Sequence, residues 1–149
     1  MSVPVLGPDV LVNASVALGS PPERVVNRVL GQHRGESPTT EWILERMGAM
    51  LRRVESFRAE AVEQQVALVR SLTRVVADDR KLGPDAWVDA LVSAARAGGV
   101  PRVVTDHPDL LERGEVGGIE FVSSEAWLLE QQMPPPPPPA PGARGRGTP

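Results

Sequence analysis

The chain has 149 residues, of which 41% are apolar and 23% charged, and this is enough for one domain with a hydrophobic core. A net charge of −3 and an aromatic content of 3% exclude a protein that attracts nucleic acid through its overall charge or stacks unpaired bases on many rings. Cysteine is absent from the sequence, which excludes disulfides and thiolate metal sites.

The first third of the chain predicts one strand followed by two helices. Residues 3–6 are apolar and indicate a short buried strand. Asp9 stands where a helix N-cap would, and apolar residues follow at helical spacing until Gly19. A second helix is predicted over residues 21–30, with proline in its first turn. Because the apolar start is short and lacks a basic leader, we expect neither a signal peptide nor a membrane span, and a cytoplasmic protein.

The middle of the chain predicts two further helices and a strand. Apolar residues at spacings of three and four indicate a helix over roughly residues 40–53, and Glu45 lies in its first turns. An amphipathic pattern predicts the next helix over roughly residues 56–70. Residues 73–76 are rich in β-branched side chains, which favours a strand.

The last third alternates helix and strand again. A helix is predicted over residues 83–98, where paired glycines end it, and Asp89 lies on its polar stripe. The elements expected after it are a strand over residues 102–105, a helix over 108–112, a strand over 119–122 and a helix over 126–132. This alternation predicts an α/β fold with a mostly parallel sheet.

The C-terminal segment has a different composition from the rest of the chain. Residues 134–139 are six consecutive prolines, and glycine, alanine, proline and arginine dominate residues 140–149. Such a composition cannot bury a core and predicts an extended, disordered tail of polyproline type over residues 133–149. We therefore expect one folded domain over residues 1–132.

Four segments occur in an order and spacing typical of one known family. They are Gly-Pro-Asp-Val-Leu-Val at residues 7–12, a Thr and a Glu six residues apart at Thr39 and Glu45, Asp89 ahead of a small-residue helix, and Val-Thr-Asp-His-Pro-Asp-Leu-Leu at residues 104–111. Over residues 3–129 the chain resembles the PIN-domain nucleases, in the branch of bacterial toxin-type ribonucleases. The resemblance implies a PIN-like, three-layer α/β/α sandwich with a mostly parallel central sheet.

The resemblance also implies a chemistry. Enzymes of this family cleave RNA phosphodiester bonds with Mg²⁺ or Mn²⁺ held by clustered carboxylates, and the metal activates water and neutralises charge on the phosphate. Glu45 and Asp89 match two of the family's acids. The other two positions depart from the pattern, because Gly7 replaces the acid after the first strand and His107 replaces the acid of the last segment.

Nearby residues could compensate for these losses. Asp9 and Asp106 are each close in sequence to a missing acid, so the candidate catalytic residues are Asp9, Glu45 and Asp89, and the candidate metal ligands are these three with Asp106 and His107. His107 would suit Mn²⁺ or Zn²⁺ better than Mg²⁺. Simpler interpretations remain open: Asp9 as an N-cap, His107 at a helix start, and the other acids as solvated charges.

Two functions are consistent with this pattern. The first is a PIN-like protein related to the endoribonucleases of toxin–antitoxin pairs, with impaired or lost catalysis, a residual binding role and no need of a cofactor. The alternative is an active endoribonuclease that uses Mg²⁺ or Mn²⁺. The resemblance suggests RNA, an antitoxin-like protein or a second copy of the chain as partners.

Overall fold

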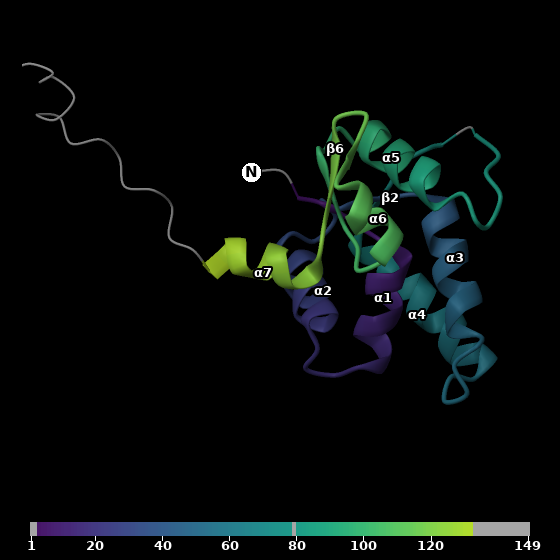
Figure 1. The fold of residues 1–149 in the computed structure, drawn as a ribbon. Helices are drawn as coiled ribbons and strands as arrows, with labels where there is room; N and C mark the ends of the chain where they lie inside the picture. The colour runs from purple at the N-terminus through teal and green to yellow at the C-terminus, as the bar shows by residue number, and fades with distance from the viewer. Residues whose placement is uncertain (1–2, 79, 133–149) are drawn as a thin grey trace, which may run out of the picture.

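The computed structural model describes residues 3–78 and 80–132, and the expected proline-rich tail lies outside them (Figure 1). The elements follow in the order β1 (Val5–Leu6), α1 (Pro8–Val16), α2 (Pro21–Gln32), β2 (Pro38–Thr39), α3 (Glu41–Leu51), α4 (Ala59–Leu72), β3 (Arg74–Val75), α5 (Trp87–Gly98), β4 (Arg102–Val104), α6 (Pro108–Arg113), β5 (Glu115–Val116), β6 (Ile119–Val122) and α7 (Ser124–Gln132). No helix within the described ranges is both long and apolar enough to cross a membrane.

The main sheet is open and mostly parallel. Its strand order is β1-β4-β6-β5, and only the edge pair β5 and β6 is antiparallel. In the parallel pair of β1 and β4, Val5 lies opposite Val103 and Leu6 opposite Val104. The mixed α/β fold with a mostly parallel sheet confirms the prediction from the alternating elements.

A second, two-stranded sheet lies beside the first. Its strands β2 and β3 are parallel, with Pro38 opposite Arg74. The buried hydroxyl of Ser37 donates a hydrogen bond of 2.7 Å to the carbonyl oxygen of Pro4, which joins the chain before β2 to the chain before β1. This contact gives the carbonyl of the buried Pro4 a hydrogen-bond partner away from solvent.

The core is built from the strands and the helices that follow them. The side chains of Val5, Val103 and Val104 are fully buried in the sheet. The helix residues packed against them recur at the spacing that the sequence indicated: Val10 and Leu11 in α1, Ile43, Leu44 and Met47 in α3, and Leu91, Ala94 and Ala95 in α5. Burial of these apolar faces is the main favourable term in folding.

Several boundaries differ from the predicted ones. Helix α4 begins at Ala59 rather than near residue 56, and α5 begins at Trp87 rather than at residue 83. Strands β2 and β5 were not expected, since each has two residues and forms only by pairing with a strand distant in the sequence or across a turn. Such short strands carry little local signal, because tertiary pairing decides them.

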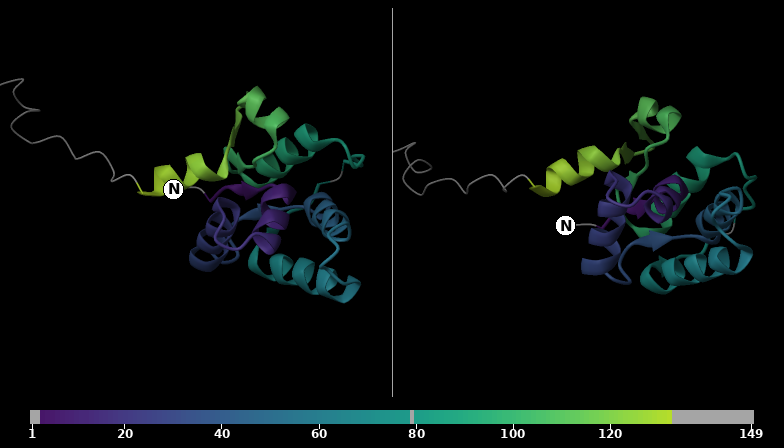
Figure 2. Two further views of the ribbon diagram at one scale, coloured as in Figure 1. Left: turned by 60° about the horizontal axis from the view of Figure 1, so that its bottom comes forward. Right: turned by 90° about the horizontal axis from the view of Figure 1, so that it is seen from below.

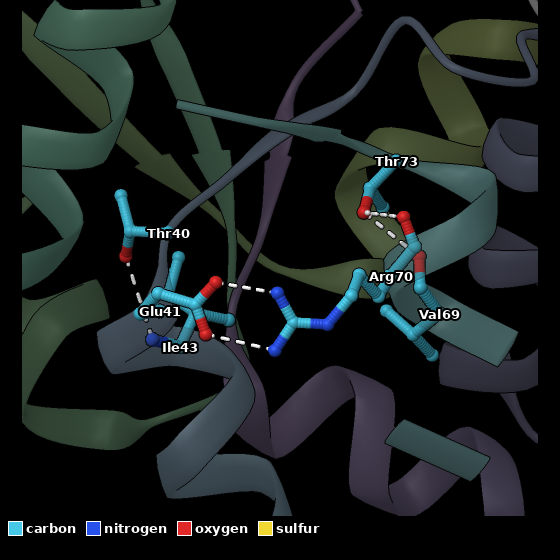
Figure 3. Close-up of polar contacts among 6 residues, drawn as sticks. All are labelled: Thr40, Glu41, Ile43, Val69, Arg70 and Thr73. Carbon is cyan, nitrogen blue, oxygen red and sulfur yellow. Dashed lines mark hydrogen bonds and ion pairs between the residues drawn. The ribbon is translucent and has the colours of Figure 1, made fainter. Parts of the chain in front are cut away.

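An exposed ion pair connects α3 to α4 (Figure 3). Both guanidinium nitrogens Nη1 and Nη2 of Arg70 bind the carboxylate of Glu41, and one of these hydrogen bonds measures 2.8 Å. The hydrogen bond from Arg70 lowers the pKa of the Glu41 carboxyl. Because both side chains are largely exposed, we assign this pair at most about 1 kcal/mol of stability.

One glycine marks a close approach of two elements. At Gly98, in the last turn of α5, a Cβ atom would lie 2.4 Å from Cβ and Cγ of Pro38 in β2. At Gly31 in α2, a Cβ atom would meet nothing within 4 Å. Gly98 therefore lets α5 pack directly on β2.

We predict that Gly98→Ala lowers the free energy of unfolding by about 1 to 3 kcal/mol, because the added methyl group overpacks the contact with Pro38. Gly31→Ala is the matched control and should raise it by up to about 1 kcal/mol, through helix propensity. Urea denaturation of both variants measures the difference. A Gly98→Ala variant as stable as the parent would contradict this packing.

Candidate functional site

A buried carboxylate joins the C-terminal ends of the neighbouring strands β1 and β4. Asp9 lies in the first turn of α1, directly after β1, and is only 8% exposed. The hydroxyl of Thr105 donates to its Oδ1 at 3.0 Å, and the backbone N–H of Asp106 donates to its Oδ2 at 2.7 Å. Both donors follow β4, so Asp9 ties the start of α1 to the C-terminal end of the neighbouring strand.

This arrangement corrects the predicted N-cap role of Asp9. The N-cap of α1 is Gly7, and no side chain caps this end of the helix. An N-cap carboxylate would accept a hydrogen bond from its own helix. The oxygens of Asp9 instead accept from Thr105 and Asp106, which are distant in the sequence and invisible to a local pattern.

Burial shifts the protonation equilibrium of the Asp9 carboxyl. Removal from water raises the pKa of the Asp9 carboxyl above its ordinary value of 3.8. The hydrogen bonds from Asp106 and Thr105 oppose this rise, and the charge of Asp106 adds to it. The folded protein therefore favours the protonated form of Asp9 more than the unfolded chain does.

The same carboxylate fills the space beside Gly7. A Cβ atom on Gly7 would lie 2.6 Å from Oδ1 of Asp9 and 3.2 Å from the carbonyl oxygen of Val104. The N–H of Gly7 donates to that carbonyl at 2.9 Å, which fixes the backbone at this position. A side chain at residue 7 is thus incompatible with the observed position of Asp9.

Asp106 and His107 turn toward different elements. The carboxylate of Asp106 accepts hydrogen bonds from the N–H of Ser124 at 2.8 Å and from its hydroxyl at 2.7 Å, which holds the start of α7. His107 is the N-cap of α6, and its Nδ1 accepts from the N–H of Asp109 at 3.2 Å. This confirms the helix-start interpretation of His107.

Three rings form what we call the aromatic row, made of Trp42, Trp87 and His107. The His107 and Trp87 ring centres are 5.0 Å apart, and those of Trp87 and Trp42 are 5.8 Å apart with the rings nearly perpendicular. Trp42 also donates its indole N–H to the carbonyl of Gly83 at 2.9 Å. Both tryptophans are only partly buried, so the row reaches the surface at the start of α3 and α5.

Glu45 and Asp89 lie on the same side of the domain but remain in solvent. Both residues are exposed. Arg80 lies 4.0 Å from the carboxylate of Asp89, and it lines a hollow of about 630 Å³ together with Glu45 and Trp42. Arg80 therefore borders the surfaces around both Glu45 and Asp89.

The proposed ligands do not form one cluster. Among residues 3–78 and 80–132, no group of three or more carboxylate or histidine side chains is arranged to hold a metal ion. Asp9 and Asp106 are linked through the backbone at the end of β4, whereas His107 joins the aromatic row. The arrangement of these side chains does not fit a metal ion, and the assignment of catalytic and ligand roles stays a prediction.

The sequence analysis missed the partners of these residues. Thr105 and Ser124 hold the two aspartates, and the Trp87 ring packs against His107 at a tilt of 53°. The only local signal for Thr105 and Ser124 was a hydroxyl residue at or just after the end of a predicted strand. Of the three tryptophans, Trp127 is buried in the core, at 5% exposed, whereas Trp42 and Trp87 are only partly buried.

A scan of the chain against protein-family models and a search of curated proteins each found no match.

We predict that substitutions at Gly7 and Asp9 are strongly coupled. Gly7→Ala alone should cost about 1 to 3 kcal/mol by overpacking. Asp9→Ala alone should cost a similar amount, because the donors of Thr105 and Asp106 lose their acceptor. In the double variant the new methyl group occupies the space that the carboxylate leaves. The loss of stability in the double variant should therefore be at least about 1 kcal/mol smaller than the sum of the two single losses.

Urea denaturation of the four proteins in this double-mutant cycle measures the coupling. Pairing Gly31→Ala with Asp9→Ala is the control, because Gly31 has no neighbouring atom to crowd and its effect should add to that of Asp9→Ala. Additive costs for Gly7→Ala and Asp9→Ala would contradict the proposed competition for one space.

Proposed function

We propose that this chain is a PIN-like protein related to the metal-dependent endoribonucleases of toxin–antitoxin pairs, in which catalysis is impaired or lost and a binding role remains. The observation that carries the proposal is the buried position of the Asp9 carboxylate, with both oxygens hydrogen-bonded to the end of β4. That carboxylate stabilises the fold through its hydrogen bonds, and it occupies the space that a side chain at residue 7 would need.

Metal-assisted phosphodiester cleavage needs carboxylates that are clustered and open to water and substrate. Gly7 supplies no oxygen, and both oxygens of Asp106 accept hydrogen bonds from Ser124. The ring of His107 lies against Trp87. Glu45 and Asp89 remain in solvent, but the guanidinium of Arg80 lies beside Asp89, where it would compete with a bound cation.

The burial of the strands supports the proposed three-layer arrangement. Successive side chains of a strand point to opposite faces of the sheet. Val103 and Val104 are both fully buried, as are Val5 and, nearly, Leu6, so both faces of β1 and β4 are covered. Sheets of parallel strands are covered in this way by helices that connect the strands.

A second candidate is an active endoribonuclease with Asp9, Glu45 and Asp89 as its acids. The observation that favours it is the exposure of Glu45 and Asp89 on one side of the domain, on a surface where Arg80 borders the hollow lined by Glu45 and also faces Asp89. Mg²⁺ commonly binds one or two carboxylates together with water and phosphate oxygens. Movement of Arg80 would leave two carboxylates on this side of the domain for such a site.

A nuclease assay on the full chain separates the two candidates. We predict no metal-dependent cleavage of a defined single-stranded RNA with Mg²⁺ or with Mn²⁺, because the carboxylates near residues 7 and 106 are absent or engaged in the fold. Glu45→Gln and Asp89→Asn are run beside the parent protein. Cleavage that both substitutions abolish would overturn the proposed loss of catalysis.

A variant that restores the family pattern serves as the positive comparison. It combines Gly7→Asp with Asp9→Asn and His107→Asp, since the resemblance places asparagine at residue 9 and acids at residues 7 and 107. Asparagine has the size of aspartate but only one acceptor oxygen, so it cannot keep both hydrogen bonds from Thr105 and Asp106 and is freer to turn away from the side chain at residue 7. Metal-dependent cleavage gained by this variant, and lost again with Glu45→Gln, would locate the defect at these positions.

A further inference from the structure

The aromatic row borders a second, smaller hollow on the same side of the domain. This hollow has a volume of about 250 Å³ and is lined by Trp42, Glu45, Arg46, Ala49, Leu82 and Pro84. Its apolar part is formed by an indole ring, an alanine, a leucine and a proline, and its polar part by one carboxylate and one guanidinium. It therefore offers an aromatic wall next to a hydrogen-bond donor.

Proline-rich segments have the chemistry that such a surface binds. A polyproline II helix has no internal hydrogen bonds, so its carbonyl groups are free acceptors, and its rings pack into aromatic-lined grooves at low entropic cost. Arg46 supplies donors for those carbonyls, and Trp42 supplies an aromatic wall. We propose that the aromatic row and this hollow bind the proline run at residues 134–139 of a second copy of the chain.

Charge supports this choice of ligand. The segment over residues 133–149 carries Arg144 and Arg146 and no acidic residue, so its formal charge is +2. Since the whole chain carries −3, the remainder carries −5. Asp89 already faces Arg80, but Glu45 and Asp85 are exposed in or next to the elements that present the row. Arginines that follow the prolines would approach these carboxylates.

The position of α7 favours a second copy over the chain's own segment. The end of α7 lies on the opposite side of the domain from α3 in each view (Figure 1 and Figure 2). Glu130 in the last part of α7 binds the guanidinium of Arg102 in β4 with hydrogen bonds of 2.6 and 2.7 Å, which holds this helix in its direction. The proline run begins two residues after α7 ends.

The reach of the proline run leads to the same conclusion. Six prolines in a polyproline II helix span about 19 Å. A small domain is about 30 Å across. The run is therefore shorter than a domain of this size is wide, which favours exchange of the proline segments between two copies. Reciprocal exchange would give a closed symmetric dimer.

This inference rests on the proposed binding role and names the ligand for it. The mass of the full chain in solution tests it. We expect sedimentation velocity to reveal a concentration-dependent dimer. Replacement of residues 134–139 by alternating glycine and serine should weaken dimerisation at least tenfold, and so should Trp42→Leu. The replacement leaves residues 3–132 unchanged, so its result does not depend on the folding of the Trp42 variant.

Leu18→Ser provides the matched control on another apolar surface. Leu18 is 84% exposed and lines a separate hollow between α1, α2 and α4, so its substitution should leave the dimer intact. A monomeric full chain, a dimer that survives the proline replacement, or a dimer lost with Leu18→Ser would each overturn the proposal.

A synthetic peptide of residues 133–149 tests the same contact directly. Added to the full chain that lacks its prolines, the peptide should change the tryptophan fluorescence in a saturable manner. A peptide with glycine and serine in place of the prolines should not. Absence of a saturable change, or an equal change with both peptides, would overturn the assignment. Because the nuclease assay reads RNA cleavage only, failure here is distinguishable from failure of the proposed loss of catalysis.

Discussion

The carboxylate of Asp9, buried between the first helix and the end of β4, is the constraint on which the rest of the site depends. Its two hydrogen bonds connect segments almost a hundred residues apart in the chain. An ionisable group is expensive to bury, and it is tolerated here because Thr105 and the backbone of Asp106 satisfy its oxygens. The ends of β1 and β4 are therefore held together by a polar contact inside the core.

This constraint accounts for the neighbouring residues. Residue 7 must be glycine because the Asp9 carboxylate occupies the adjoining space. The N–H of Asp106 donates to Asp9. The carboxylate of Asp106 accepts from Ser124 and so holds the start of α7. The next residue, His107, faces Trp87 instead. Where the family resemblance implies open carboxylates, this chain has a closed polar contact and an aromatic surface.

The sequence predicted the helices and the mostly parallel sheet because apolar periodicity and helix-ending glycines are local signals. The β4 strand and the helix start at His107 were predicted for the same reason. The N-cap role of Asp9 was wrong, since its hydrogen-bond partners are distant in the sequence and an aspartate near a helix start usually acts as a cap. The aromatic row was also missed, because local spacing cannot distinguish a tryptophan that packs inward from one that reaches the surface.

The most direct test is the titration of the Asp9 carboxyl carbon by NMR, with and without Mg²⁺. Because burial raises the pKa of Asp9, folding favours the protonated carboxyl. The free energy of unfolding therefore falls as the pH rises from the unfolded-state pKa of Asp9 to its folded-state pKa. We predict a pKa above 3.8 and a curve that Mg²⁺ leaves unchanged. A titration curve that Mg²⁺ moves to lower pH would contradict a carboxylate committed to the fold.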